Sequence, residues 1–268
     1  MTNPPLTGRT AVVTGVSRRR GIGFAVAARL ADMGASLYLQ HFAPHDAEQP
    51  WGAEDIGEVM DLLRARLQPG ARLAHGEHDF AAPDAPNALI QDAAAALGHL
   101  DILICNHARS GGDGPLQALD AAMLDAHWAV NARSVLLTTA RFADQHDGRP
   151  GGRVIWFTSG QVLGPMPGEI AYAASKAALA GITPSVSADL ADRGILLNTV
   201  NPGPVNTGYL DPETADRPLE VLDDVGSGFP GGRFGAPDDP ARLIAWLVSD
   251  EGRWMVGQTI STEGGFRR

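Results

Sequence analysis

The chain has 268 residues, of which 44% are hydrophobic, and it carries a formal net charge of −10. This length and apolar content are sufficient for one large domain with a substantial core. The acidic balance argues against non-specific binding to nucleic acid or to an anionic membrane, so neither is expected as a partner.

The N-terminus and the cysteine content indicate the compartment. The first ten residues, MTNPPLTGRT, lack the basic and then apolar pattern of a signal peptide. No apolar stretch approaches the about 20 residues that span a membrane. The one cysteine, Cys105, lies in the apolar run DILIC, where core packing is its expected role, and it excludes an intrachain disulfide. We therefore expect a soluble cytoplasmic protein.

Short runs rich in valine, isoleucine and leucine alternate along the chain with longer amphipathic segments. Apolar runs without polar alternation are typical of strands that are buried on both faces of a parallel sheet. The expected strands are 10–15, 36–41, 73–80, 101–107, 152–159, 195–203 and 259–262. The expected helices are 22–33, 53–67, 84–97, 118–145, 169–192 and 238–249. This alternation predicts one α/β domain over residues 1–268, a Rossmann-type doubly wound parallel sheet of about seven strands with helices on both faces.

Two segments interrupt the alternation. The stretch 41–52, HFAPHDAEQPWG, predicts a long loop after the second strand. The stretch 202–240 is rich in glycine, proline and aspartate and follows the sixth strand. Loops of this length are usually functional or disordered, and in such a sheet ligands bind beyond the carboxyl ends of the strands. We expect a substrate lid at about 204–235.

The stretch 12–23, VVTGVSRRRGIG, joins the first strand to the first helix. Gly15, Gly21 and Gly23 allow a tight turn and a close approach of the backbone to a pyrophosphate at the helix N-terminus. A glycine-rich turn alone is weak evidence, but its position in a first strand–helix unit strengthens the interpretation. The same turn holds three adjacent arginines at 18–20, although the chain is acidic as a whole.

The stretch FTSGQVLGPMPGEIAYAASKAAL holds Ser159, Tyr172 and Lys176. Tyr172 and Lys176 are four residues apart in an expected helix and therefore share one face. An ammonium group near a phenol favours the phenolate, so we expect the pKa of Tyr172 to lie below its usual value of about 10. Tyr172 would then be a usable acid or base, with the Ser159 hydroxyl bonding a substrate carbonyl oxygen. A tyrosine and a lysine at helical spacing are commonplace, and only the combination with the glycine turn favours catalysis.

Together these motifs resemble the classical short-chain dehydrogenase/reductase family over nearly the full length. The shared motifs follow the family's order: TG…GIG, Asp79, NHA at 106–108, Asn131 in VNARS, Ser159, YAASK, NPGPVNT at 201–207 and the terminal GQTISTEGG. Within the family the chain is most similar to the 3-oxoacyl-acyl-carrier-protein reductase-like branch. The resemblance implies an oxidoreductase that transfers a hydride between a nicotinamide cofactor and a small carbonyl or secondary alcohol substrate. It also implies a homotetramer or a homodimer.

The resemblance assigns roles by position. Tyr172 would protonate the carbonyl oxygen, Ser159 would orient it, and Lys176 would lower the pKa of Tyr172 and bond the nicotinamide ribose. Asn131 would hold a water that links Lys176 to solvent. The expected cofactor-binding residues are Gly15, Ser17, Arg18, Gly21, Ile22, Gly23, His41, Asp79, Phe80, Asn106, Ala108, Tyr172, Lys176, Pro202, Gly203, Val205 and Thr207.

The sequence favours NADP(H) over NAD(H) as the cofactor. In this fold an acidic residue at the end of the second strand bonds the ribose hydroxyls of NAD and would repel a 2′-phosphate. That position falls on His41, which carries no negative charge, whereas Ser17 and Arg18 lie in the adjacent turn. We expect Arg18 to contact the 2′-phosphate; the alternative is a solvated loop, and one phosphate cannot engage all three arginines closely. NAD(H) remains the second candidate.

Two departures from the family pattern concern the same site. The family commonly has NNAG after the fourth strand, and here His107 and Arg109 stand in NHAR. These two residues either face the substrate or are tolerated loop variants. The glycine turn also carries two more residues than the usual pattern, which bears on the phosphate contacts. His75 and His78 in HGEHD have a spacing that suits no zinc motif, so no metal is expected.

Two other classes of function remain open at this point. A dinucleotide-binding regulatory protein can share the fold, because fold does not determine function. The full set of Asn131, Ser159, Tyr172 and Lys176 argues against that alternative, since a sensor would not need all four. A dehydratase or an epimerase would require a product assay to exclude.

Overall fold

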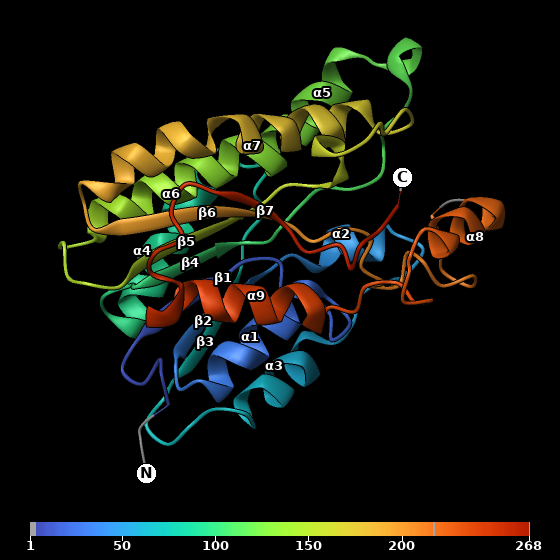
Figure 1. Ribbon diagram of the computed structural model, residues 1–268. Coiled ribbons are helices and arrows are strands. Elements are labelled where there is room, and N and C mark those ends of the chain that lie inside the picture. Colours follow the sequence, from blue (N-terminus) through green and yellow to red (C-terminus); the bar gives the residue numbers. More distant parts are fainter. Residues whose placement is uncertain (1–3, 217, 268) are drawn as a thin grey trace.

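The computed structural model describes residues 4–216 and 218–267, and a seven-stranded parallel sheet forms its centre (Figure 1). The strand order is β3-β2-β1-β4-β5-β6-β7. The strands are β1 (Thr10–Val13), β2 (Ser36–His41), β3 (Leu73–Glu77), β4 (Ile102–Cys105), β5 (Gly152–Phe157), β6 (Ile195–Asn201) and β7 (Thr259–Ser261). All seven expected strands are confirmed, as is the doubly wound parallel sheet.

Helices cover both faces of the sheet (Figure 1). One face carries α1 (Ile22–Asp32), α3 (Ile56–Arg64) and α9 (Asp238–Val248). The other carries α4 (Ala85–Leu97), α5 (Ala121–Trp128), α6 (Ser134–Gln145) and α7 (Ile170–Ala191). Each face has its own core of buried side chains. All six residues of β5 are buried, which explains why the central strands read as continuous apolar runs.

The structure adds two short helices inside the segments expected to be loops. The first, α2 (Ala43–Ala47), lies in the 41–52 loop, and the second, α8 (Leu219–Ser227), lies in the expected lid. The ends of the lid segment are joined by a bridge between Val205 and Gly235, where Asn206 donates its backbone N–H to the Gly235 carbonyl at 2.8 Å. The segment is therefore anchored at its base.

The expected helix over 118–145 is divided in the structure. Asp120 caps α5 by accepting a hydrogen bond from the Met123 backbone N–H at 2.8 Å. A stretch of π-helix, Ala129–Arg133, separates α5 from α6. Such insertions occur frequently at functional sites, and this one contains Asn131. Within the described residues, no helix is both long and apolar enough to cross a bilayer.

Candidate active site

The residues predicted to form the site converge on the carboxyl edge of the sheet. The glycine turn follows β1, His41 ends β2, Asn106 follows β4, Ser159 follows β5 and Pro202 follows β6. Strand connections run in opposite directions from the β1–β4 pair, which is the switch point where ligands bind in open parallel sheets. The topology thus brings together residues that are far apart in the chain.

The glycine-rich turn is held closely against the end of β4. Gly15 has φ of +72°, and a Cβ atom on it would lie 2.8 Å from the Asn106 amide nitrogen. That nitrogen donates to the carbonyls of Thr14 and Gly15 at 3.0 and 3.1 Å. At Gly23 an added Cβ would collide with the Gly15 carbonyl. Only glycine fits either position, because a Cβ would collide with the protein itself, so these two residues let the turn pack closely against the end of β4 and the start of α1.

Helix α1 begins at Ile22 without a side-chain cap. Its N-cap residue is Gly21, and the first turn contains no acidic residue. The first N–H groups of a helix have no partner within the helix, and together with the dipole they attract an anion. The turn therefore presents an uncapped helix N-terminus at the place predicted for the pyrophosphate.

Helix α7 places Tyr172 and Lys176 on one face. The Lys176 Nζ lies 5.8 Å from the centre of the Tyr172 ring and donates to the Phe157 carbonyl at 3.2 Å. Lys176 is buried, and among the described residues no carboxylate forms an ion pair with it. The Ser159 hydroxyl hydrogen-bonds the Tyr172 phenol, so the three predicted catalytic side chains are neighbours.

The expected lowering of the Tyr172 pKa is wrong for the chain without ligands. Burial raises the pKa of Tyr172 to about 12, although its hydrogen bond to Ser159 acts in the opposite direction. Burial also lowers the pKa of Lys176 to about 8. Desolvation disfavours the charged form of each group and is the largest cause of both shifts. In this structure the phenol is the stable form at neutral pH, and it is therefore a proton donor.

Asn131 connects the π-helix to two loops of the site. Its side-chain oxygen accepts the Arg109 backbone N–H at 2.7 Å, and its amide nitrogen donates to the Ser175 hydroxyl at 3.1 Å. Ser175 in turn donates to the Tyr172 carbonyl at 2.7 Å. Asn131 is fully buried. Its contacts join the loop after β4 to helix α7.

Asp113 is a site residue that the sequence analysis missed. Its carboxylate accepts the backbone N–H groups of Ala171 at 3.0 Å and Tyr172 at 2.7 Å. It thereby caps the N-terminus of α7, whose own N-cap residue, Glu169, supplies no side-chain cap. The signal in the sequence was weak, because the cap comes from a loop 58 residues before Ala171.

His107 and Arg109, the two residues of NHAR that depart from the family pattern, lie in different surroundings. His107 is buried, contacts the Thr14 hydroxyl at 2.6 Å and the Ser134 hydroxyl at 2.8 Å, and stacks on Phe80. Burial lowers its pKa to about 3, so it is a neutral packing residue. The Arg109 guanidinium instead lies close enough to His127 to help lower the pKa of that histidine. His127 meets the Tyr172 ring edge-on at 6.3 Å, and Arg109 also helps to lower the pKa of His45 in α2, so its guanidinium lies between these two histidines.

Each of the three adjacent arginines has a different acidic partner. Arg18 bonds Asp46 of α2 at 2.8 Å, Arg19 bonds Glu54 at 2.7 Å, and Arg20 bonds Asp211 of the lid segment at 2.6 Å. Arg18 also donates to the Thr207 carbonyl at 2.6 Å and lies over the ring of Trp51. The run therefore fastens both long loops to the glycine turn.

The remaining cofactor residues predicted from the sequence lie around this turn. Burial lowers the pKa of His41 to about 4, so the end of β2 is uncharged at neutral pH. The Ser17 hydroxyl accepts the Phe42 backbone N–H at 3.3 Å. Asp79 is exposed beside the buried Phe80. The other expected residues, Ala108, Pro202, Gly203, Val205 and Thr207, follow β4 and β6 at the same edge.

Comparison with known proteins agrees with this fold and arrangement. The family described as Enoyl-(Acyl carrier protein) reductase matches residues 15–267. An uncharacterised oxidoreductase of Bacillus subtilis is 38% identical over 262 residues, which cover 97% of each chain. A cyclohexanol dehydrogenase of Rhodococcus is 33% identical over 274 residues, covering 98% of this chain and 97% of the relative.

A solved structure gives the same result. A short-chain dehydrogenase of Burkholderia cenocepacia in complex with NADP superimposes with a TM-score of 0.82 at 32% identity, over 97% of this chain and 98% of that one. The chain belongs to the short-chain dehydrogenase/reductase family. It is therefore an oxidoreductase of a family that binds a nicotinamide dinucleotide and acts on small molecules.

Proposed function

We propose that the protein is an NADP(H)-dependent reductase of ketones or aldehydes that also oxidises the corresponding alcohols, with Tyr172 as the acid and base. The observation that carries the proposal is the pairing of Tyr172 with the buried Lys176, beside Ser159, at the carboxyl edge of the sheet. Tyr172 is protonated at neutral pH, which suits donation of a proton to a carbonyl oxygen.

Each neighbour of Tyr172 has a role in the proposed reaction. Ser159 donates a hydrogen bond to the carbonyl oxygen and orients it toward the phenol. Lys176, which has no carboxylate partner among the described residues, supplies the positive charge that stabilises the phenolate once the proton has left. Asn131 fixes helix α7 through Ser175. Because burial already lowers the pKa of Lys176 to about 8, a modest change of its surroundings can alter its protonation.

The residues around the glycine turn fit a dinucleotide. The turn provides the two glycine positions that admit no side chain and an uncapped helix N-terminus, both suited to a pyrophosphate. A bound nicotinamide cofactor supplies the hydride, and the chain's own residues hold and orient the partners. Lys176 would bond the nicotinamide ribose, while Thr207 and Val205 would frame the nicotinamide.

The preference for NADP(H) is supported by the end of β2. His41 is neutral there, so the residue that ends β2 has no negative charge to repel a 2′-phosphate. Asp46 lies nearby, but its carboxylate is paired with Arg18 at 2.8 Å. Arg18 is the proposed phosphate ligand. It bonds Asp46 and Thr207 in this structure, and these contacts use two of the five N–H donors of its guanidinium. The Burkholderia relative was solved with NADP, which agrees with this preference.

The segment at about 204–235 is proposed as the substrate lid. Its base is fixed by the Val205–Gly235 bridge, and Asp211 is tied to Arg20 of the glycine turn. Its contact with that turn would let lid position depend on whether a cofactor lies there.

The test is a turnover assay with both reduced cofactors. The purified protein is incubated with NADPH or NADH and a panel of cyclohexanone, acyclic ketones, diketones, aldehydes and a 3-oxoacyl thioester. We expect NADPH oxidation with formation of the secondary or primary alcohol, identified by mass spectrometry. Tight NADPH binding without turnover of any carbonyl would favour the regulatory alternative, and a product of dehydration or epimerisation would reassign the reaction class.

A further inference from the structure

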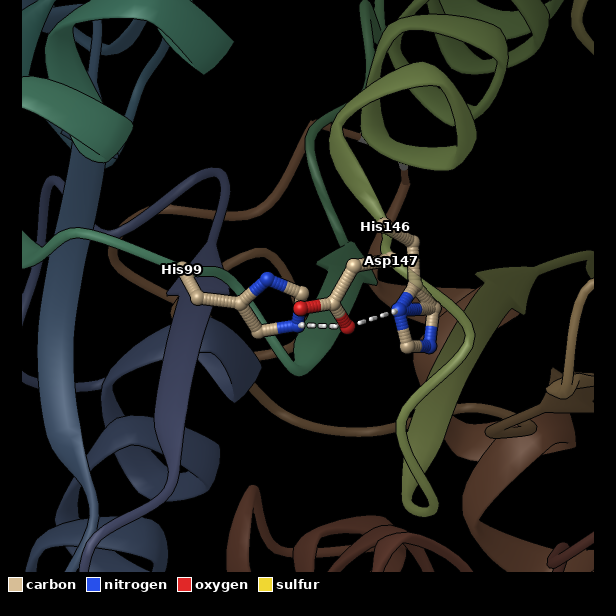
Figure 2. A group of neighbouring side chains, drawn as sticks. All are labelled: His99, His146 and Asp147. Atoms are coloured by element: carbon tan, nitrogen blue, oxygen red, sulfur yellow. Dashed lines mark ion pairs between the residues drawn. The ribbon is translucent and has the colours of Figure 1, made fainter.

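A second group of titratable side chains lies at the opposite edge of the sheet from Tyr172. His99 precedes β4, His146 follows the end of α6, and Asp147 begins the turn that leads to β5. Figure 2 shows the two imidazole rings directed toward the Asp147 carboxylate, which lies between them. The group takes no part in the proposed reaction, and it joins His99 to the adjacent residues His146 and Asp147, which lie far from it in the sequence.

The spacing of the donor atoms approaches that of a metal site. Asp147 Oδ1 lies 4.0 Å from His99 Nε2 and 4.0 Å from His146 Nδ1, and all three atoms lie within 4.8 Å of one another. In a tetrahedral zinc site with bonds of about 2.0–2.2 Å, neighbouring ligand atoms are separated by roughly 3.3–3.6 Å. Asp147 is half-exposed, so rotation of its side chain can reduce both separations.

The histidine nitrogens that face the carboxylate lack hydrogen-bond partners. The His146 side chain is completely buried, and neither of its ring nitrogens has a partner among the described residues. Its Nε2 abuts Gly152, where a Cβ would collide with it, so Nδ1 is the nitrogen left to face Asp147. His99 Nε2 is likewise buried without a hydrogen-bond partner within that part of the chain. A buried donor or acceptor without a partner is unfavourable, and a bound cation would offset that cost.

Asp101 places a second carboxylate beside His99, outside the group of three donors. Its Oδ1 lies 3.7 Å from His99 Nε2, while its Oδ2 is held by the Thr10 backbone N–H at 2.8 Å. The three donors are two imidazole nitrogens and one carboxylate oxygen, and the carboxylate of Asp101 adds negative charge beside His99. Imidazole ligands favour zinc and related transition metals over magnesium or calcium.

We propose that His99, His146 and Asp147 form a binding site for a divalent transition metal, with Zn²⁺ as the ion. The site joins the connection before β4 to the turn before β5, and bound zinc stabilises the folded chain by mass action. Arg149 is its internal competitor, because its Nε and backbone N–H both donate to Asp147 Oδ1, at 2.9 and 3.1 Å. Zinc must displace at least one of these donors.

The test measures zinc affinity by competition with a fluorescent zinc chelator, on full-length protein without an affinity tag and after treatment with EDTA. We expect one ion per chain and a higher Tm with zinc. Asp147→Asn should weaken binding by more than about a hundredfold, the upper end of the loss typical of changes outside the ligand shell. Arg149→Ala should tighten it. Asp144→Asn is the matched control, because Asp144 is an exposed carboxylate of α6 outside the group, and it should change nothing.

Two results would overturn the proposal. One is the absence of stoichiometric zinc binding, or equal affinity in the wild type and Asp147→Asn. The other is binding that survives in Asp147→Asn but is lost in His75→Gln, which would assign the ion to the His41–His75 pair. Because Asp147 is half-exposed, Asp147→Asn should fold, so a loss of zinc binding in this variant reports the loss of a ligand and not unfolding.

Discussion

At the residue scale, Arg18 joins two loops in this structure and is also the proposed ligand of the 2′-phosphate. Its guanidinium bonds Asp46 and the Thr207 carbonyl, which are 28 and 189 residues away in the chain. The sequence predicted an unusual role for this residue from its place in the glycine turn. Its partners could not be predicted, because they depend on how two long loops fold back over that turn.

Arg18→Ala should weaken NADPH binding about ten- to 150-fold, the equivalent of one charge-assisted hydrogen bond of about 1.5–3 kcal/mol. NADH binding should change much less, because it has no 2′-phosphate. Asp46→Asn should instead tighten NADPH binding, since it releases Arg18 Nε from a carboxylate. Fluorescence titration of both cofactors at fixed salt measures these constants. If Arg18→Ala weakened NADPH and NADH binding equally, Arg18 would have only a structural role in joining the two loops.

The sequence spacing of Tyr172 and Lys176 predicted their position on the helix but not their pKa values. Their separation of four residues predicted a shared helix face, and the structure confirms it. The direction of the Tyr172 pKa shift was predicted wrongly, because spacing carries no information on burial. Desolvation raises the pKa of Tyr172 and lowers that of Lys176. His107 is a similar case: the sequence left its role open, and burial makes it a packing residue.

At the scale of elements, apolar runs identified the central strands because β1, β4 and β5 are buried on both faces. The edge strands β3 and β7 are partly exposed but were also placed correctly. The same reasoning missed α2 and α8, which are short and lie in segments rich in loop-forming residues. It also joined α5 and α6 into one helix, because a π-helical insertion preserves the helical pattern on either side. The cap of α7 was missed because Asp113 reaches it through tertiary structure.

Asp113→Ala should lower kcat, because it removes the two hydrogen bonds that fix the start of the helix bearing Tyr172. We expect a loss of stability of about 0.5–2 kcal/mol, as for other helix caps, and a fall in kcat approaching a hundredfold, as small misplacements can cause. The measurements are urea denaturation and steady-state kinetics with NADPH.

Asp55→Ala is the matched control for that variant. Asp55 caps α3 through the Glu58 backbone N–H at 2.9 Å, and α3 holds no predicted site residue. It should lose comparable stability at unchanged kcat. If both variants affected kcat alike, Asp113 would have only a structural role. Partial recovery of kcat in Asp113→Asn would support positioning.

At the scale of the whole molecule, an apolar area on the outer faces of α5 and α7 is consistent with assembly. Leu124 and Trp128 are 40% and 47% exposed, and with Ala171 and Ala174 they line a shallow hollow of about 200 Å³. Exposed apolar patches of this kind often mark interfaces. We propose a homo-oligomer, either a tetramer or a dimer, that buries this surface.

Light scattering at micromolar concentration should give a multiple of the 28.1 kDa chain mass. Trp128→Glu should shift the mass toward smaller species, because it places a charge in the contact. Leu62→Glu is the control, since Leu62 is 47% exposed on α3, away from that area. A wild-type monomer, or an unchanged mass for Trp128→Glu, would contradict this interface.

The catalytic role of Tyr172 is tested most directly by kcat of Tyr172→Phe with NADPH and a carbonyl substrate that the wild type reduces. The variant keeps the ring and removes the phenolic proton. We expect kcat to fall by about a hundred- to ten-thousand-fold, the usual contribution of general acid catalysis, with the Kd for NADPH nearly unchanged. A variant that retains more than about a tenth of the wild-type kcat would contradict the assignment of Tyr172 as the proton donor.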